Sequence, residues 1–309
     1  MPDDSVDFTL LENGLDFIWS AVEHLDVAST KRDLKYATLH LVSGIELVLK
    51  ERVRREDWTL LFPDPSKADL KTYERGAFRS IGFDECLILL ESESYVEFTD
   101  DELVRLRTIR DKRNRLEHLT ITDSPEAIIA SAVEALEVIV DFIREHLADV
   151  ALNAGEEGLL AKIRTKLGNL EAFVDARQKS LAPKLADAYA ILPCPACLQD
   201  ALSVDDGVKC LFCGYATSAD DAADAYAAHV VGTSRFRYEK DGGIWPILLC
   251  PSCRWDTCVA AHEQGHLCFG CGGKWALGDL EECGRCGGLV EEGDAICSRC
   301  LDDVASRDD

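Results

Sequence analysis

Residues 194–213 read CPACLQDALSVDDGVKCLFC, which is two Cys-x-x-Cys pairs separated by 12 residues. Two residues between the cysteines allow a tight turn, or knuckle, to direct both sulfurs at one metal ion, and a second pair on a facing hairpin completes a tetrahedral site. The arrangement recurs twice further along the chain, with 14 and 10 residues between the pairs. The sequence therefore predicts three small β-hairpin units with one structural zinc site each. The predicted ligands are Cys194, Cys197, Cys210, Cys213, Cys250, Cys253, Cys268, Cys271, Cys283, Cys286, Cys297 and Cys300.

The residues beside these cysteines also favour knuckles. Pro195 and Pro251 follow the first ligand of a pair, whereas Gly214, Gly272 and Gly287 follow the second ligand, where a positive φ is expected. In these features the C-terminal part resembles zinc ribbons. The expected units are 193–216, 246–276 and 277–309. Because four thiolates leave no coordination position for water, we expect these sites to stabilise the fold rather than perform chemistry.

The sequence leaves other assignments of the cysteines open. The last four pairs can also bind in cross-brace order, the first with the third and the second with the fourth. Cys258, His262 and His266 lie inside the second loop and can replace a ligand, although four thiols already suffice. Iron–sulfur clusters usually have more tightly grouped cysteines, and a redox pair belongs at a strand-to-helix turn. Unmetallated thiols are the remaining alternative.

The composition is acidic and otherwise typical of a globular protein. The 309 residues include 33 Lys and Arg against 57 Asp and Glu, which gives a formal net charge of −24. Such a chain cannot bind nucleic acid through its overall charge, so binding requires a local basic patch. No apolar run is long enough to span a membrane, and the start MPDDSVDF lacks the basic region of a secretory signal. We expect a cytoplasmic protein without a membrane partner, in which paired cysteines bind metal.

Residues 1–150 predict an all-α domain of four or five principal helices. Apolar residues recur there at three- and four-residue steps, as on one face of an amphipathic helix. Thr99 and Ser124 are expected to cap two of the helices, and Pro125 suits the first helical position after Ser124.

Residues 151–192 predict a helical linker between this domain and the cysteine-rich part. Within it, 156–182 keeps a seven-residue apolar rhythm that is interrupted by one polar residue, Arg177. The stretch fits a spacer, a coiled-coil seam or a helix packed on the first domain. An alanine-rich connecting helix is expected within 217–245, between the first two cysteine units.

One stretch of the helical part reverses the charge of the chain. Residues 105–115 hold six cations and a single acid, Asp111. Such runs usually form a solvated helical face with ion pairs, here Asp111 with Arg115 or Arg113 with Glu117. The alternative is that the run is the local basic patch that nucleic-acid binding would require. The candidate RNA-binding residues are then Arg105, Arg107, Arg110, Lys112 and Arg115.

Arg113 does not fit a purely solvated face. It falls on the apolar stripe that contains Leu106 and Ile109. An arginine on such a stripe must reach a cleft or a partner, because burying its charge unpaired is unfavourable. Asn114 and His118 are four residues apart and share a helical face, and the Arg113 side chain is long enough to converge with both.

Residues 113–118, Arg-Asn-Arg-Leu-Glu-His, resemble the R-x4-6-H motif of the HEPN superfamily, in which a polar residue commonly follows the arginine. Residues 44–50, Gly-Ile-Glu-Leu-Val-Leu-Lys, are similar to the second-helix segment of many prokaryotic HEPN proteins. The motif also falls near the end of a late helix. The resemblance covers residues 1–150 and implies a multidomain chain, in which an HEPN-like helical bundle precedes the helical linker and three zinc ribbons.

The resemblance implies metal-independent RNA cleavage with Arg113, Asn114 and His118 as catalytic residues. The ribose 2′-OH is the nucleophile, an imidazole can transfer its proton near neutral pH, and a guanidinium can bind the phosphate as its charge grows. The expected products carry 2′,3′-cyclic phosphate and 5′-OH ends. Because the chain has one motif, we expect a homodimer through the helical domain to supply the second.

The implied role is a toxin–antitoxin, stress or phage-defence effector, in which the zinc ribbons recognise the RNA target or a regulatory protein partner. A competing hypothesis is a non-catalytic HEPN adaptor that binds RNA or protein and uses its ribbons for docking. The acidity of the chain favours the adaptor. A third hypothesis is a zinc-dependent regulator of transcription or translation.

Overall fold

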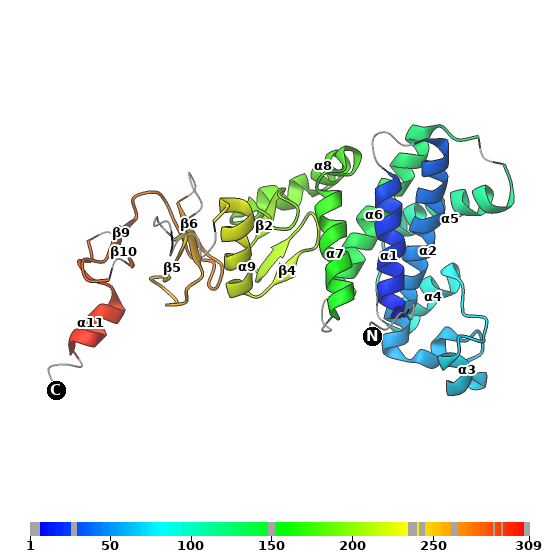
Figure 1. Ribbon diagram of the computed structural model, residues 1–309, viewed down its shortest axis with the longest axis horizontal. Helices are drawn as coiled ribbons and strands as arrows, with labels where there is room; N and C mark the ends of the chain where they lie inside the picture. Colours follow the sequence, from blue (N-terminus) through cyan, green and yellow to red (C-terminus); the bar gives the residue numbers. More distant parts are fainter. Residues whose placement is uncertain are drawn as a thin grey trace. The chain divides into compact units, whose positions relative to one another are not determined.

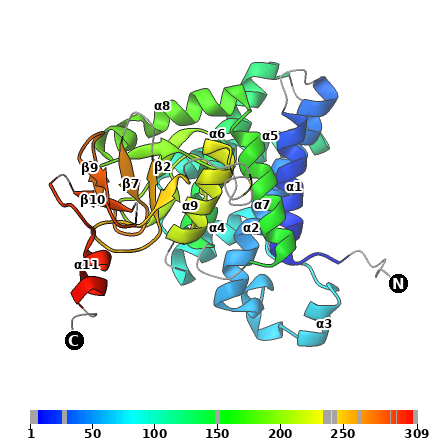
Figure 2. The ribbon, with the colours of Figure 1, turned by 60° about the vertical axis from the view of Figure 1, so that its left-hand side comes forward.

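The computed structural model describes residues 7–25, 30–94, 96–120, 122–147, 152–233, 240, 245–260, 265–286, 288–291 and 293–305. The chain divides into two compact units, Met1–Ser180 and Leu181–Asp309. Figure 1 and Figure 2 label most of the helices and several strands of the two units. Among the described residues, no helix combines the length and the apolar character that crossing a bilayer requires.

The first unit is built from helices, as the apolar periodicity predicts. The long ones are α1 (Leu10–His24), α2 (Lys31–Glu56), α4 (Phe83–Glu93), α5 (Asp100–His118), α6 (Pro125–His146) and α7 (Ala154–Leu167). A further helix, α8 (Glu171–Asp187), begins in this unit and ends in the second. Two 3-10 turns (Trp58–Leu61 and Pro65–Lys67) and the short α3 (Leu70–Glu74) connect α2 to α4. Thr99 and Ser124 cap α5 and α6 through side-chain hydrogen bonds, which confirms both predicted helix starts.

Close packing of α1 on α2 forms the centre of this unit. Leu15 and Ile18 of α1 are fully buried, as are Leu41 and Ile45 of α2. A Cβ atom at Gly44 would lie 2.7 Å from the carbonyl oxygen of Gly14 and from Cγ1 of Ile18. Glycine at position 44 therefore lets the two helices approach more closely than any other residue would allow.

The stretch 156–182 forms two helices rather than one, because the chain turns at 168–170 between α7 and α8. The Thr9 hydroxyl at the start of α1 donates to Oε1 of Glu156 in α7 over 2.6 Å. Arg177 of α8 donates from both Nη atoms to the carboxylate of Asp141 in α6, over 2.7 and 2.5 Å. Of the three alternatives for this stretch, packing on the first helices is the observed one, and Arg177 interrupts the apolar rhythm because it pairs with a carboxylate.

The second unit contains two four-stranded antiparallel sheets in which each strand pairs with the next along the chain. The first sheet has β1 (Ile191–Pro193), β2 (Asp200–Ser203), β3 (Val208–Cys210) and β4 (Ala216–Thr217). The second has β5 (Ile247–Leu248), β6 (Cys258–Ala260), β7 (His266–Cys268) and β8 (Lys274–Trp275). Between them, α9 (Ala219–Tyr226) continues into a π-helical turn (Ala227–Val231), where the predicted connecting helix ends. The ring of Tyr226 meets that of Phe269 edge to face at 5.7 Å, so α9 packs on the second sheet.

The third cysteine unit differs from the other two. It contains one hairpin, β9 (Leu280–Glu282) with β10 (Leu289–Glu291), followed by α11 (Ser298–Ala305). Cys297 and Cys300 therefore lie at the start of a helix rather than in a second hairpin. The 10 residues between its cysteine pairs hold one strand and a turn, whereas the longer loops of the first two units hold two strands. Leu289 of the third cysteine unit packs among the cysteines of the second cysteine unit, and this contact joins these two cysteine units.

Candidate functional site

The first four cysteine pairs form knuckles of one design. In each knuckle the amide of the residue after the second cysteine donates to the carbonyl of the first cysteine over 2.8–3.1 Å. That residue has a φ between 60° and 73° in all four knuckles. Gly214 and Gly272 confirm the predicted positive φ, and Gly287 lies outside the described residues. Leu198 and Arg254 adopt the same conformation without being glycine, at a cost of about 1 kcal/mol each.

The sulfurs of each unit form one cluster that can bind a metal. The clusters are Cys194, Cys197, Cys210 and Cys213; Cys250, Cys253, Cys268 and Cys271; and Cys283, Cys286, Cys297 and Cys300. Facing sulfurs lie 3.6–3.8 Å apart. A tetrahedron with metal–sulfur bonds of about 2.3 Å requires about 3.8 Å between sulfurs, so the donor set fits a four-thiolate ion. Pairing in sequence order is confirmed, and the cross-brace alternative is wrong.

The three clusters differ in their exposure to solvent. All four cysteines of the first cluster are buried, whereas Cys271 of the second and Cys286 of the third are exposed. The amide of Cys297 donates to Sγ of Cys283 over 3.2 Å. This bond, together with a second from the amide of Arg285, lowers the pKa of the Cys283 thiol to about 6. Backbone amides thus stabilise the thiolate form of Cys283, which is the form that binds a metal ion.

The additional donors of the second loop are not part of its cluster. Cys258 is fully buried in β6, opposite Cys268 of β7, and is absent from the four sulfurs that converge. Burial, and then the charge of nearby thiolates, raises the pKa of Cys258 to about 12, so it remains a neutral thiol. His266 is half-buried in β7, where burial lowers its pKa. His262 lies outside the described residues.

The three motif residues lie in the last two turns of α5. Nη1 of Arg113 lies 2.8 Å from Oε2 of Glu117 and 3.0 Å from Oδ1 of Asn114, whose carbonyl accepts its hydrogen bond. The same Glu117 oxygen is 3.7 Å from Nε2 of His118. The side chain of Arg113 is 30 % exposed and that of His118 is 67 % exposed. Arg113 is therefore partly buried and forms the ion pair with Glu117 that the solvated-face interpretation predicts, and the imidazole is open to solvent.

Glu117 is the part of this arrangement that the motif pattern does not include. Its carboxylate lies between the guanidinium and the imidazole and contacts both. The four-residue spacing from Arg113 predicts the first contact as an ordinary helical ion pair. The contact with the neighbouring His118 has no comparable spacing signal in the sequence.

The other cations of 105–115 are also paired with carboxylates of the same chain. Arg105 pairs with Asp101 and with the buried Glu137, Arg107 and Arg110 pair with Asp84, and Lys112 and Arg115 pair with Asp123. Asp111 pairs with Arg110 rather than with Arg115. The observed pairs match the solvated-face interpretation in kind. The acids that form several of them lie in other segments, so spacing along one helix could not identify them.

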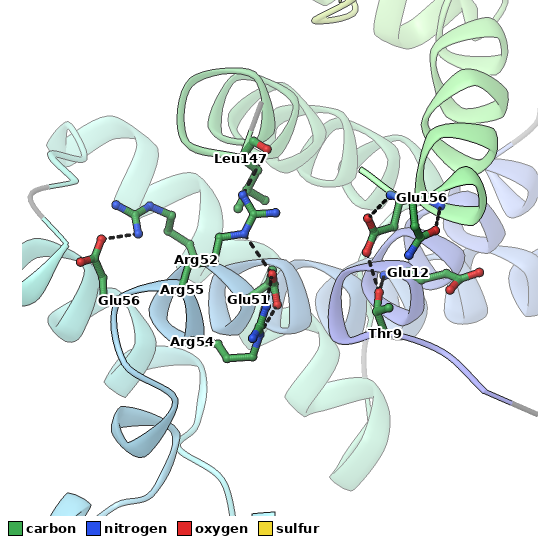
Figure 3. Close-up of polar contacts among 10 residues, drawn as sticks. Thr9, Glu12, Glu51, Arg52, Arg54, Arg55, Glu56, Leu147 and Glu156 are labelled. Carbon is green, nitrogen blue, oxygen red and sulfur yellow. Dashed lines mark hydrogen bonds and ion pairs between the residues drawn. The ribbon is translucent and has the colours of Figure 1, made fainter. Parts of the chain in front are cut away.

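A second group of cations, at the end of α2, is held in the same way (Figure 3). The buried carboxylate of Glu51 accepts hydrogen bonds from Arg54 and Arg55, and Arg55 also donates to the carbonyl of Leu147. Burial acts to raise the pKa of Glu51, but the two arginines outweigh it and leave the pKa lowered. These arginines therefore connect the end of α2 to the end of α6, and we interpret their contacts as structural.

Two features of the described residues can support chemistry, the cysteine clusters and the end of α5. The three clusters can bind metal. At the end of α5, Arg113 contacts Asn114, and the exposed imidazole of His118 contacts Glu117, which also pairs with Arg113. No protein-family model, no curated protein and no solved structure matches this chain.

Proposed function

We propose that the protein is an HEPN-type endoribonuclease that acts as a homodimer and carries three structural zinc ions. The observation that supports the nuclease is the group at the end of α5, where Arg113, Asn114 and His118 lie within two helical turns and the imidazole is two thirds exposed. An exposed imidazole can reach a substrate proton, which a buried one cannot.

The proposed reaction transfers phosphate within the RNA strand. The ribose 2′-oxygen attacks phosphorus, its proton passes to an imidazole, and the bond from phosphorus to the 5′-oxygen breaks. A second imidazole protonates that 5′-oxygen, so the products are a 2′,3′-cyclic phosphate and a 5′-OH. Arg113 binds the phosphate oxygens once it leaves Glu117, and Asn114 holds the guanidinium or donates to the phosphate.

The need for two imidazoles supports the homodimer, since each chain has one motif. Val104, on α5 itself, and Leu119, just after α5, are 60 % and 75 % exposed. Apolar side chains on the helix that carries the motif suit a contact between two copies, which would place the second His118 in the same groove.

Zinc is the proposed ion because four cysteine thiolates with a tetrahedral spacing are its preferred structural site. Each unit has few buried apolar residues of its own, so the ion supplies much of its folding free energy. With no coordination position left for water, these sites hold the fold, and the units serve to recognise the RNA target or a regulatory protein.

The test uses the full chain, purified with its metal, on structured and single-stranded RNA. We expect cleavage that persists in EDTA, 2′,3′-cyclic phosphate ends, and intact DNA. His118→Ala and Arg113→Ala each lower the cleavage rate at least 100-fold. The control is His229→Ala, which removes an exposed imidazole of the second compact unit and leaves the cleavage rate unchanged. Intact RNA with wild-type protein, or equal rates for His118→Ala and His229→Ala, would overturn the nuclease proposal.

The second candidate is a non-catalytic HEPN adaptor that docks RNA or protein through its zinc units. The observation that favours it is the neutralisation of the basic stretch, because each cation of 105–115 already contacts a carboxylate. An adaptor would bind its partner equally well with His118→Ala. A nuclease effector in defence or in a toxin–antitoxin pair would lose its toxicity on expression with that substitution.

A further inference from the structure

The segment between α2 and α4 carries cations of a different kind from those of α5. Lys71, Arg75 and Arg79 are exposed, and within the described part of the chain their side chains have no carboxylate partner. Lys71 and Arg75 are one helical turn apart, with about 6 Å between their Cβ atoms. Three exposed cations without an ion pair thus lie within nine residues, in a protein of net charge −24.

Aromatic rings hold this segment in one conformation. Phe62 and Phe78 stack at 4.1 Å, and Tyr73 lies 5.1 Å from Trp58 and 6.0 Å from Phe78. The rings form a small separate core under α3, and the cations lie outside it. Such packing reduces the conformational entropy that the segment loses when it binds a ligand.

Backbone and side-chain hydrogen bonds close both ends of the segment. The amide of Ile81 donates to the carbonyl of Leu61 over 3.0 Å, and Gly76, with a φ of 62°, ends α3. Lys50 of α2 donates to the Ser80 hydroxyl over 3.0 Å. In both ribbon views α3 lies apart from the long helices of its unit (Figure 1, Figure 2). The three cations therefore stand on a fixed projection rather than on a mobile loop.

We infer that residues 70–79 dock the backbone of single-stranded RNA. This inference rests on the proposed function, because it takes RNA as the ligand. Lys71, Arg75 and Arg79 contact neighbouring phosphates, while Tyr73, on the other side of α3, packs on Trp58 and holds the helix in place. A phosphate reaches these cations without displacing a carboxylate, which is not so for the cations of α5. The segment thus supplies the local basic patch that so acidic a chain needs.

The test measures RNA binding in the cleavage-deficient His118→Ala chain, by anisotropy of a labelled single-stranded RNA across a range of salt concentrations. The variant replaces Lys71, Arg75 and Arg79 together with glutamine. Three lost phosphate contacts lower the slope of log affinity against log salt by about 2. Between about 50 and about 200 mM salt, the parent chain then loses about 20-fold more affinity than the variant.

The matched control replaces three exposed lysines on separate helices, Lys35, Lys162 and Lys179, with glutamine, and we expect the parent slope. Replacing Arg75 and Arg79 with lysine keeps the charge and also keeps the slope. Equal slopes for the two glutamine triples, or no RNA binding by the parent chain, overturn the inference; the projection then serves an acidic protein partner or none. A lowered slope in a protein that cleaves no RNA removes the nuclease proposal and leaves the docking segment standing.

Discussion

The buried ion pair between α6 and α8 predicts an asymmetry between its two partners. Arg177 is 2 % exposed and donates twice to Asp141. Asp141→Ala leaves a buried guanidinium without its carboxylate, and such a change destabilises by about 3–5 kcal/mol. Arg177→Leu leaves Asp141 a quarter exposed and still 2.7 Å from Arg144. We therefore expect that substitution to destabilise by only about 1–2 kcal/mol.

The assay is unfolding of the full, metal-loaded chain, followed by circular dichroism at a helical wavelength, since the first unit is built from helices. For a unit of this size 1 kcal/mol shifts Tm by about 2–4 °C, so we expect a fall of about 12 °C for Asp141→Ala and about 4 °C for Arg177→Leu. Asp175→Ala, an exposed acid of α8, serves as the control and stays within about 0.5 kcal/mol of the parent. If Arg177→Leu destabilises as much as Asp141→Ala, or if both behave like the control, the reasoning fails.

Three further predictions concern the clusters, the motif and pH. Mass spectrometry of the metal content should find three ions per chain; Cys268→Ser removes one, while Cys258→Ser, outside the cluster, removes none. Glu117→Gln removes the carboxylate that holds the motif arginine, and an exposed ion pair of about 0.2–1 kcal/mol predicts RNA binding about 1.4- to 5-fold tighter in titrations. Burial, and then the charge of His24, lowers the pKa of His40 below 6.5, so the fold favours its neutral form. Stability from this group is present above pH 6.5 and is lost as pH falls through the lowered pKa; urea midpoints of His40→Gln should fall less steeply with acid than those of the parent.

The metal clusters could be predicted from the sequence because each knuckle is a local structure. Two residues between cysteines determine the turn, and the separation of successive pairs determines which pairs can meet. The glycines after the second cysteine carry the same information, and Gly214 adopts the predicted φ. The positive φ of Leu198 and of Arg254 could not be predicted, because neither side chain favours that conformation. There the knuckle imposes the conformation on the residue.

Contacts between distant segments account for what the sequence did not predict. Arg177 looks like a defect in an apolar rhythm until Asp141, 36 residues earlier, is seen beside it. The break between α7 and α8 is marked by Gly168, the C-cap of α7, and by Asn169, but the apolar rhythm continues across it and hides the break. The helix that replaces a hairpin in the third unit has a visible cause, the shorter loop, but only a comparison of all three loops reveals it.

Local charge shows why a basic run is a poor measure of phosphate binding. Residues 105–115 contain six cations in the sequence, yet in the fold Asp84 and Asp123 reach them from other segments. Displacing these four pairs opposes binding by about 1–4 kcal/mol in total, which can offset most of what the phosphate contacts supply. The exposed cations of 70–79 incur no such penalty, although this segment contains three cations and 105–115 contains six. In an acidic protein, the cations that lack a carboxylate partner are therefore the ones that decide where a polyanion binds. Under the proposed function, the motif at the end of α5 would act on a strand that is held by residues 70–79.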